Sequence, residues 1–144
     1  MFGDESEAAI VKVMRLREQL RPYVMEQYKA AAADGTPIMR PLFFDFHTDL
    51  GSQTVDDQLM FGPDYLVAPV LQKGVQSRSV YLPPLPVGTV WENHFTKVTT
   101  DTSEGGRRIT EATPNTGEGF GTFPLYRRAP AAAITPGGTR AGIL

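Results

Sequence analysis

The sequence contains no cysteine among its 144 residues, and this absence excludes several classes of site. A disulfide framework, a thiol nucleophile and a thiolate-ligated metal site all require cysteine. Long apolar runs are also missing, because the uninterrupted apolar stretches are a few residues long and a membrane-spanning helix needs about 20. The opening residues, 1–7, are acidic and lack the basic region of a signal peptide. The sequence therefore predicts no membrane partner.

An excess of positive charge is lacking as well. The chain carries 14 Lys and Arg residues against 16 Asp and Glu residues, for a formal net charge of −2 and a pI near 5.6. A protein that binds nucleic acid chiefly through phosphate needs a basic surface, so we expect no nucleic-acid partner. Length is limiting too, because a (β/α)8 barrel takes about 250 residues. The chain can hold one ordinary domain, or parts of two, but not a complete large enzyme.

Residues 8–34 are predicted to form a helix. Apolar residues recur at steps of three and four, which is the period of a buried helical stripe; they are Ile10, Val13, Met14, Leu20, Val24 and Tyr28. Pro22 lies inside this pattern and is expected to kink the helix or split it in two. Asp34-Gly35 is a usual helix stop, and Pro37 follows closely.

The segment after this helix changes in character. Residues 38–46 are almost continuously apolar, which is typical of a strand covered on both faces in a parallel sheet, so helix and strand together predict half of an α/β unit. Residues 47–55 are expected to form a loop. Residues 56–61 are expected to form one helical turn, closed by Gly62-Pro63.

Short antiparallel strands are predicted beyond residue 64. Six apolar or β-branched runs are separated by Gly, Pro and Asn, and this spacing is typical of a sandwich; they are 65–70, 79–82, 87–91, 95–99, 108–112 and 123–127. The last stretch, 129–144, is rich in Ala, Gly and Pro and is expected to fray.

Four carboxylates follow the apolar segment closely: Asp45, Asp49, Asp56 and Asp57. Catalytic groups of α/β barrels lie at the carboxyl ends of strands, so an acid/base pair is one interpretation. The other is that loops use Asp to form turns. The second is favoured, because Asp56 and Asp57 are adjacent and cannot approach one substrate atom from opposite sides.

Other candidate sites are weaker. His47 and His94 are the only histidines, and their spacing matches no usual metal-ligand pattern, so no metal or cofactor site is predicted. No Gly-x-Ser-x-Gly nucleophile motif is present, and the glycines at 105–106 and 117–121 lack the spacing of a phosphate loop. The pairs Arg107-Arg108 and Arg127-Arg128 flank predicted strands and favour blunting of sheet edges over anion binding.

Four aromatic residues of the predicted sandwich could form a platform on which a sugar ring stacks: Tyr65, Tyr81, Trp91 and Tyr126. Aromatic residues on strands more often pack in a core or an interface. Both interpretations stay open on composition and spacing alone.

Seven short motifs, each weak by itself, occur in an order that resembles glycoside hydrolase family 31, over residues 2 to about 136. They are Phe2-Gly3-Asp4-Glu5 with Arg15-Leu16-Arg17, Leu20-Arg21-Pro22-Tyr23, Gly35-Thr36-Pro37-Ile38-Met39-Arg40-Pro41-Leu42, Asp57-Gln58-Leu59-Met60-Phe61-Gly62, Leu66-Val67-Ala68-Pro69-Val70, Arg78-Ser79-Val80-Tyr81-Leu82-Pro83 before Trp91, and Phe123-Pro124-Leu125-Tyr126-Arg127. The opening and the Leu-Arg-Pro-Tyr helix look closest to α-xylosidase and α-glucosidase members.

This resemblance implies an α+β chain: the last helix/strand unit of a (β/α)8 TIM barrel, residues 1–63, followed by an antiparallel β-sandwich, residues 64–136, and a frayed tail, residues 137–144. It also implies a retaining α-glycosidase that hydrolyses O-glycosyl bonds of α-glucosides or α-xylosides, with a carbohydrate substrate in the full-length parent. The family's aspartate nucleophile and acid/base lie in motifs with no counterpart here, so no catalytic residue is transferred. Asp57-Gln58 matches a motif whose role looks structural.

The same resemblance shows departures. Ala129-Pro130-Ala131-Ala132 replaces a glycine-bearing turn, and Met1 falls at an internal position of the family, so we expect a C-terminal fragment from a truncated gene product or partial gene model. The fragment is expected to be inactive alone. The alternatives are a non-catalytic module that binds carbohydrate through exposed aromatics such as Trp91, and a structural β-sandwich whose exposed apolar strand at 38–46 causes aggregation.

Overall fold

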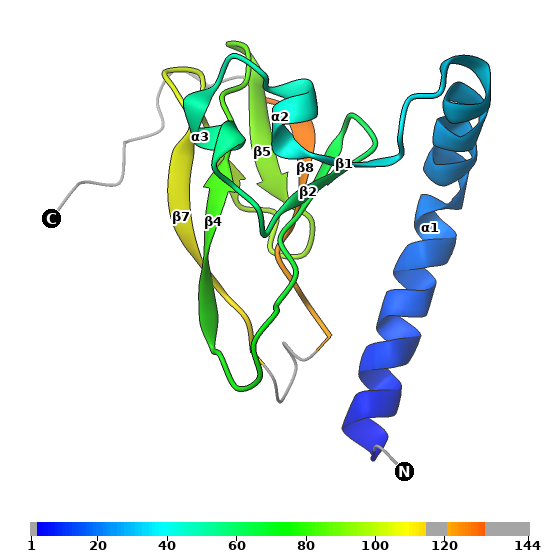
Figure 1. The fold of residues 1–144 in the computed structure, drawn as a ribbon. Helices are drawn as coiled ribbons and strands as arrows, with labels where there is room; N and C mark the ends of the chain where they lie inside the picture. Colours follow the sequence, from blue (N-terminus) through cyan, green and yellow to red (C-terminus); the bar gives the residue numbers. More distant parts are fainter. Residues whose placement is uncertain (1–2, 115–120, 132–144) are drawn as a thin grey trace, which may run out of the picture.

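The computed structural model describes residues 3–114 and 121–131, which form three helices and two antiparallel sheets (Figure 1). The helices are α1 (Asp4–Asp34), α2 (Leu42–Asp45) and α3 (Leu50–Gln53). The strands are β1 (Met39–Pro41), β2 (Leu59–Phe61), β3 (Tyr65–Val67), β4 (Ser77–Leu82), β5 (Thr89–Asn93), β6 (Thr99–Thr100), β7 (Arg107–Ala112) and β8 (Leu125–Pro130).

The two sheets and helix α1 are arranged in layers. One sheet has six strands in the order β1-β2-β3-β8-β5-β6, and β4 pairs with β7 in the other. Every strand pair among the described residues is antiparallel. Figure 1 shows α1 on the side of the larger sheet that faces away from β4 and β7. The predicted antiparallel sheets are therefore confirmed, in an arrangement typical of a β-sandwich domain.

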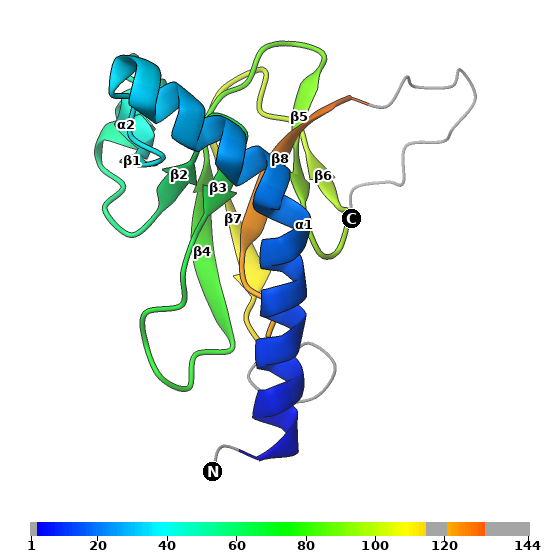
Figure 2. The same cartoon turned by 90° about the vertical axis from the view of Figure 1, so that its right-hand side faces the viewer.

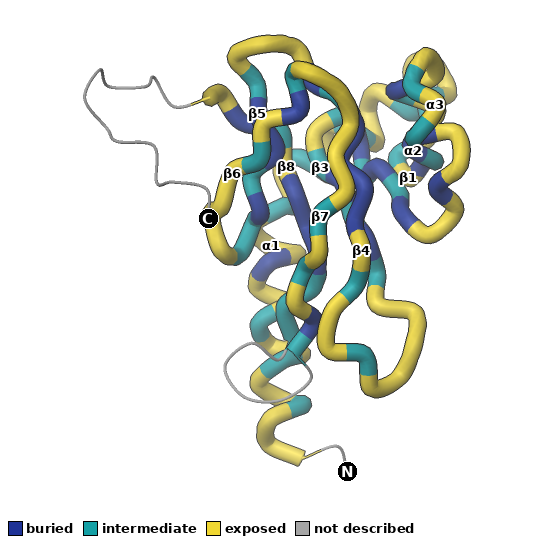
Figure 3. The backbone as a smooth tube through the Cα atoms, turned by 90° about the vertical axis from the view of Figure 1, so that its left-hand side faces the viewer, coloured by how far each residue is buried: buried dark blue, intermediate teal, exposed yellow. Residues whose placement is uncertain are grey.

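The hydrophobic core lies between the two sheets. Its largest members are fully buried, and they come from α2 and both sheets; they are Leu42, Met60, Leu66, Val80, Leu82, Trp91 and Tyr126. Figure 3 shows the buried positions gathered in the central strands, whereas the backbone of α1 is mostly exposed. Leu16 is the single buried residue of α1.

Helix α1 is one continuous element of 31 residues that contains Pro22, and Figure 2 shows that it changes direction partway along its length. A proline inside a helix removes one hydrogen bond and crowds the preceding turn, so the predicted kink is confirmed and a split is not observed. The helix ends at Gly35, whose φ of 79° and N–H donation to the Ala31 carbonyl form a left-handed cap.

Two predictions for residues 38–61 were wrong. The expected buried strand at 38–46 is only three residues of β1, antiparallel to β2 at the edge of the sheet, followed by α2. Phe43 and Phe44 are half-exposed, so the continuous apolar run does not mark a strand covered on both faces. No helical turn forms at 56–61: residues 59–61 are strand β2. Gly62, at a φ of 61°, then reverses the chain into β3.

The later strands follow the prediction more closely. β3, β4, β5, β7 and β8 overlap the expected runs, whereas of the run 95–99 only Thr99 lies in a strand, β6. There the Asn93 side-chain carbonyl accepts the N–H groups of Phe95 and Thr96 and holds a turn. The expected loop 47–55 contains the short helix α3. The predicted frayed tail, 137–144, lies outside the described residues.

The six-stranded sheet joins both halves of the chain. β1 and β2 precede residue 64, yet β2 pairs with β3 beyond it. The larger sheet therefore crosses the predicted domain boundary at residues 63/64, and that boundary stays a prediction. Helix α1 does not have the length of apolar sequence that a membrane span requires, and neither does any other helix of the described part.

Candidate functional site

The four carboxylates that the sequence pointed to have different partners, and only Asp49 contacts Tyr81, where α3 meets β4. Asp49 caps α3: its Oδ2 accepts the N–H of Ser52 at 2.9 Å and the hydroxyl of Ser52 at 2.6 Å. The Tyr81 hydroxyl donates to the same oxygen at 2.8 Å. One carboxylate oxygen thus fixes a helix start and joins it to strand β4, which is a structural role.

The electrostatics of this pair differ from those of a general acid. Burial opposes ionisation of Asp49, but the hydrogen bonds from Ser52 and Tyr81 outweigh it and lower the pKa of Asp49 below its ordinary value of 3.8. Burial and the Asp49 carboxylate together raise the pKa of Tyr81 to about 12. A glycosidase acid needs a raised carboxyl pKa, so Asp49 is the wrong residue for that task.

Two glycines make room for the Tyr81 ring. A Cβ atom at Gly51 or Gly106 would overlap the Tyr81 hydroxyl. Neither glycine has a positive φ, so the requirement is space, not backbone conformation. The Arg108 guanidinium lies 5.4 Å from the centre of the same ring. The phenol is therefore enclosed on several sides by the protein.

The remaining carboxylates of the cluster are held by arginines or exposed. Asp45 receives two hydrogen bonds from Arg40, at 2.7 and 2.8 Å, and Arg40 is only 5% exposed. Asp57 pairs with Arg78 at 2.5 Å, whereas Asp56 is exposed. The interpretation of these aspartates as turn and fold elements fits these contacts better than an acid/base pair.

Gln58 is a buried residue of the Asp57-Gln58 motif, 2% exposed. Its side-chain amide donates to the Tyr81 carbonyl and accepts the Tyr81 N–H, each at 2.7 Å. The amide therefore takes the place of a neighbouring strand. It makes one pair of ladder-type hydrogen bonds with the edge of β4 that does not pair with β7. This geometry gives a physical reason for the structural role that the motif suggested.

The histidines do not form a metal site in the part of the chain that is described. Groups of three or more His, Asp or Glu side chains suited to a metal are absent there. His47 is exposed. Burial, followed by the charges of Lys97 and Arg127, lowers the pKa of His94, which favours the neutral imidazole.

Of the two interpretations of the four aromatic residues, core packing is the correct one for Trp91, Tyr126 and Tyr81. Trp91 is fully buried and donates through Nε1 to the Pro83 carbonyl at 2.8 Å. Tyr126 and Tyr81 are also buried, at 1% and 7% exposure, and Tyr126 donates to the Glu111 carboxylate. A sugar ring cannot reach these faces, because the two sheets close over them.

The arginine pairs separate into different environments. Arg107 and Arg108 lie on β7, an edge strand, as predicted. Arg127 and Arg128 lie on β8, between β3 and β5, so the edge-blunting interpretation was wrong for them. Arg127 pairs with Glu92 at 2.9 Å, and the Arg128 guanidinium lies over the rings of Phe46 and Trp91.

Tyr23 fastens α1 to the sheet, a role that the helical pattern did not single out. Its hydroxyl donates to the Phe61 carbonyl at 2.9 Å and accepts the Asp64 N–H at 3.1 Å. Burial raises the pKa of Tyr23 to about 12. The hydroxyl occupies the space that a Cβ on Gly62 would need. The Pro22-Tyr23 and Phe61-Gly62 motifs were the sequence signals of this contact.

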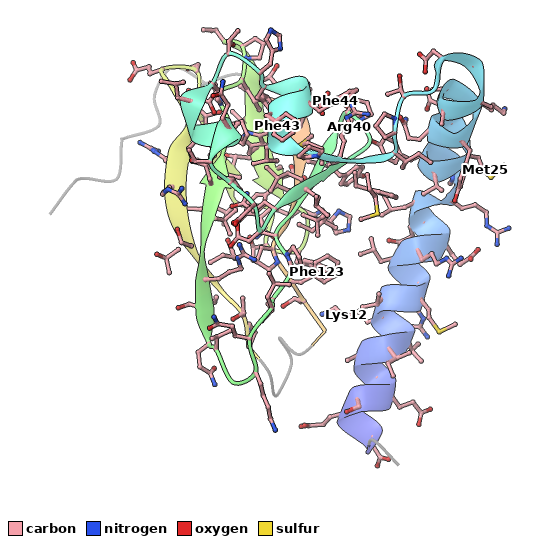
Figure 4. The ribbon with its side chains drawn as sticks, viewed as in Figure 1. Lys12, Met25, Arg40, Phe43, Phe44 and Phe123 are labelled. Carbon is pink, nitrogen blue, oxygen red and sulfur yellow. The ribbon has the colours of Figure 1, made fainter. Side chains whose placement is uncertain are left out.

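A groove of about 730 Å³ lies between the first half of α1 and the turn after β5. Its lining includes Glu7, Lys12, Arg15, His94 and Phe95. The Lys12 ammonium lies 5.6 Å from the centre of the Phe95 ring, and Figure 4 shows Lys12 directed from α1 toward the sheets. Charges of both signs beside an aromatic ring give this groove the potential to bind a polar, uncharged molecule.

Comparisons with known proteins place these observations in a family. Residues 35–132 match the family model described as the glycosyl hydrolase family 31 C-terminal domain. An α-xylosidase of Emericella nidulans is 31% identical over 141 residues, which cover 94% of this chain and 16% of that protein. An α-glucosidase 2 of Bacillus thermoamyloliquefaciens is 34% identical over 82 residues, which cover 57% of this chain and 10% of that protein.

A solved structure shows the same fold. The crystal structure of a GH31 α-xylosidase from a soil metagenome, complexed with xylose, matches with a TM-score of 0.79 and 40% identity. The match covers 91% of this chain and 18% of that one. The chain thus spans less than a fifth of the length of the relatives described here.

Proposed function

Because this chain belongs to glycosyl hydrolase family 31, we propose that it works as the C-terminal part of a retaining α-glycosidase that hydrolyses α-glucosides or α-xylosides. Helix α1 would be the end of the (β/α)8 catalytic barrel, and the segment from residue 35 onward, which matches the family's C-terminal domain, would form the sandwich beside it. The predicted boundary at residues 63/64 falls inside the larger sheet, where β2 pairs with β3, so residues 35–63 are assigned to the sandwich in this proposal. The chain's role is to support the catalytic domain, and the chemistry lies elsewhere.

The observation that carries this proposal is the position of α1. The family's C-terminal domain matches from residue 35, so α1 precedes it, yet the similarity to the Emericella nidulans α-xylosidase covers 94% of the chain. Tyr23 holds α1 against the Phe61–Asp64 turn. These facts support a chain that spans the junction between the C-terminal domain and the domain before it.

The chemistry of the carboxylates supports inactivity of the chain alone. Retaining hydrolysis needs two carboxyl groups about 5 Å apart, one as nucleophile and one as acid/base. Asp45, Asp49 and Asp57 are each bound by basic or hydroxyl groups of the fold. We expect no turnover of aryl α-glucosides or aryl α-xylosides by the chain, with circular dichroism to confirm that it is folded. Clear turnover by folded chain would refute the supporting role.

A chimera tests the positive part of the proposal. The matching segment of the Emericella nidulans α-xylosidase is replaced by this chain, and activity on an aryl α-xyloside is measured. We expect an active chimera, and expect activity to fall when Gln58→Leu is introduced, since Gln58 holds β4 in place. A folded chimera without activity would contradict the proposed role.

A second candidate is carbohydrate binding without catalysis, and the groove at Phe95 favours it. Hydroxyl groups both donate and accept hydrogen bonds, so a neutral sugar suits a lining that carries carboxylates and cations together. Isothermal titration with maltose and xyloglucan oligosaccharides tests it. A dissociation constant below about 1 mM, lost on Phe95→Ala and kept on Phe43→Ala, would support binding in this groove.

A further inference from the structure

Arg128 of β8 carries a positive charge for which the fold provides no counter-charge in direct contact. Its guanidinium lies 5.1 Å from the centre of the Phe46 ring and 5.8 Å from that of Trp91. With the residues that the structure describes, its side chain forms no hydrogen bond and no ion pair, and its Nε atom is buried. Two aromatic rings attract a cation, but they do not supply the oxygen acceptors that five N–H donors require.

The carboxylates whose charges reach Arg128 are those of Asp45 and Asp64. Both oxygens of Asp45 accept hydrogen bonds from Arg40, at 2.7 and 2.8 Å. Asp64 is exposed, and its backbone carbonyl, not its carboxylate, accepts the backbone N–H of Arg128 at 2.9 Å. Burial lowers the pKa of Arg128, these two carboxylates offset that effect only in part, and the charge of Arg40 adds to it. A partly buried cation without a paired anion destabilises a fold, so the surroundings of Arg128 favour a further negative charge.

The arrangement also indicates which kind of anion fits. The donors of a guanidinium point outward in its plane as a rigid fork, which matches the two oxygens of a carboxylate. Arg128 is only partly buried, so a group from outside can approach this fork. Arg40 and Asp45 neutralise each other, which leaves one unpaired positive charge. A singly charged carboxylate balances that charge better than a doubly charged phosphate does.

We propose that Arg128 binds a carboxylate group that comes from outside this chain. Phe46 and Trp91 hold the guanidinium, and the carboxylate accepts a pair of hydrogen bonds from its terminal nitrogens. The carboxylate has two possible sources with the same chemistry: a small carboxylate in solution, or an Asp or Glu side chain in the larger part of the parent enzyme. The second source rests on the proposed function, whereas the first is independent of it.

Tryptophan fluorescence of the full chain measures binding, because Trp91 is the only tryptophan and lies beside Arg128. Sodium acetate is compared with sodium chloride at equal ionic strength and neutral pH. We expect a saturable change in emission with acetate and none with chloride. The dissociation constant should be on the order of 10 mM, because acetate has few atoms with which to bind.

Variants of the two neighbouring arginines test whether the response belongs to Arg128. Arg128→Lys keeps the charge but loses the fork of donors, so it should weaken acetate binding by at least about fivefold. Arg127→Gln is the matched control, because Arg127 lies on the opposite face of β8 and pairs with Glu92; it should leave acetate binding unchanged. NMR of the wild-type chain does not depend on the folding of a variant. There the Nε–H signal of Arg128 should move with acetate, and that of Arg127 should not.

The α-xylosidase chimera distinguishes the two sources. If Arg128→Gln lowers the Tm of the chimera more than Arg127→Gln does, and has no such excess effect in the chain alone, the carboxylate belongs to the parent enzyme. Acetate binding to the chain, with equal effects of the two substitutions in the chimera, assigns the carboxylate to solution. Equal responses of the chain to acetate and chloride, together with equal effects in the chimera, would overturn the proposal. A folded but inactive chimera would contradict the proposed function and leave the acetate result unaffected.

Discussion

Replacing Gln58 by leucine is the most direct test of how the two sheets are held together. The substitution preserves most of the side-chain volume and removes both hydrogen bonds of the buried amide. The Tyr81 N–H and carbonyl then lose their partners beside the core, where water cannot replace them. An unsatisfied buried polar group costs about 1–3 kcal/mol, so the two backbone groups together cost about 2–6 kcal/mol.

Thermal and urea unfolding, followed by circular dichroism, measure this loss. At roughly 3–4 °C per kcal/mol for a domain of this length, a stability change of this size lowers Tm by about 6–24 °C. Gln53→Leu is the matched control, because Gln53 donates one hydrogen bond to the His47 carbonyl from an exposed position. We expect a change within about 0.5 kcal/mol for that control. Equal effects of the two substitutions would refute the bridging role of Gln58.

Gln58→Glu adds a pH dependence to the same test. A protonated glutamic acid can donate to the Tyr81 carbonyl and accept the Tyr81 N–H, as the amide does, whereas a carboxylate cannot donate. Burial and the facing carbonyl should raise the carboxyl pKa in the folded state above its ordinary value near 4.3. The stabilising bond is then present at low pH and is lost as pH rises through that folded pKa. A variant no more stable relative to wild type at pH 5 than at pH 8 would contradict this geometry.

Three further outcomes follow from the described contacts. Tyr23→Phe should cost about 1–2 kcal/mol in chemical unfolding, because the hydroxyl serves two backbone groups, and Tyr28→Phe on the exposed side should change stability by less than about 0.5 kcal/mol. The Asp49 carboxylate stabilises the fold above its unfolded pKa near 3.8, and this contribution is lost as pH falls through its lowered folded pKa; acid titration should show a smaller loss for Asp49→Asn than for wild type. Trp91 is the only tryptophan and is fully buried, so fluorescence emission should be blue-shifted and poorly quenched by acrylamide until unfolding, and strong quenching of native protein would disagree with that burial.

The sequence predicted the parts of the fold that depend on local pattern. The helix through Val13, Leu20 and Val24 has the correct period, and the strand around Val80 lies between clear turn residues. The segment from Ile38 to Phe46 misled, because continuous apolarity does not distinguish a buried strand from a short helix with half-exposed phenylalanines. In the structure Arg40 forms an ion pair with Asp45 at the end of the short helix α2. An ion pair of this kind leaves no periodic pattern in the sequence.

The candidate site was harder to predict than the fold, for a related reason. Asp49 and Asp57 were found as a cluster, but their partners Tyr81 and Arg78 lie more than 20 residues away. Trp91 looked equally suited to a surface or a core, since a strand alternates its faces and the sequence does not say which face the second sheet covers. Motif order identified the family, because it depends on seven segments and not on any one environment.

The position of strand β8 determines when the larger sheet can form during protein synthesis. It is the last strand of the described chain, yet it lies inside the larger sheet, where it pairs with β3 on one side and β5 on the other. During synthesis, β1 to β3 and β5 to β6 emerge from the ribosome as two separate groups with open edges. The sheet closes only when residues 125–130 become available, so a nascent chain that stalls before them exposes two unpaired edges to its neighbours.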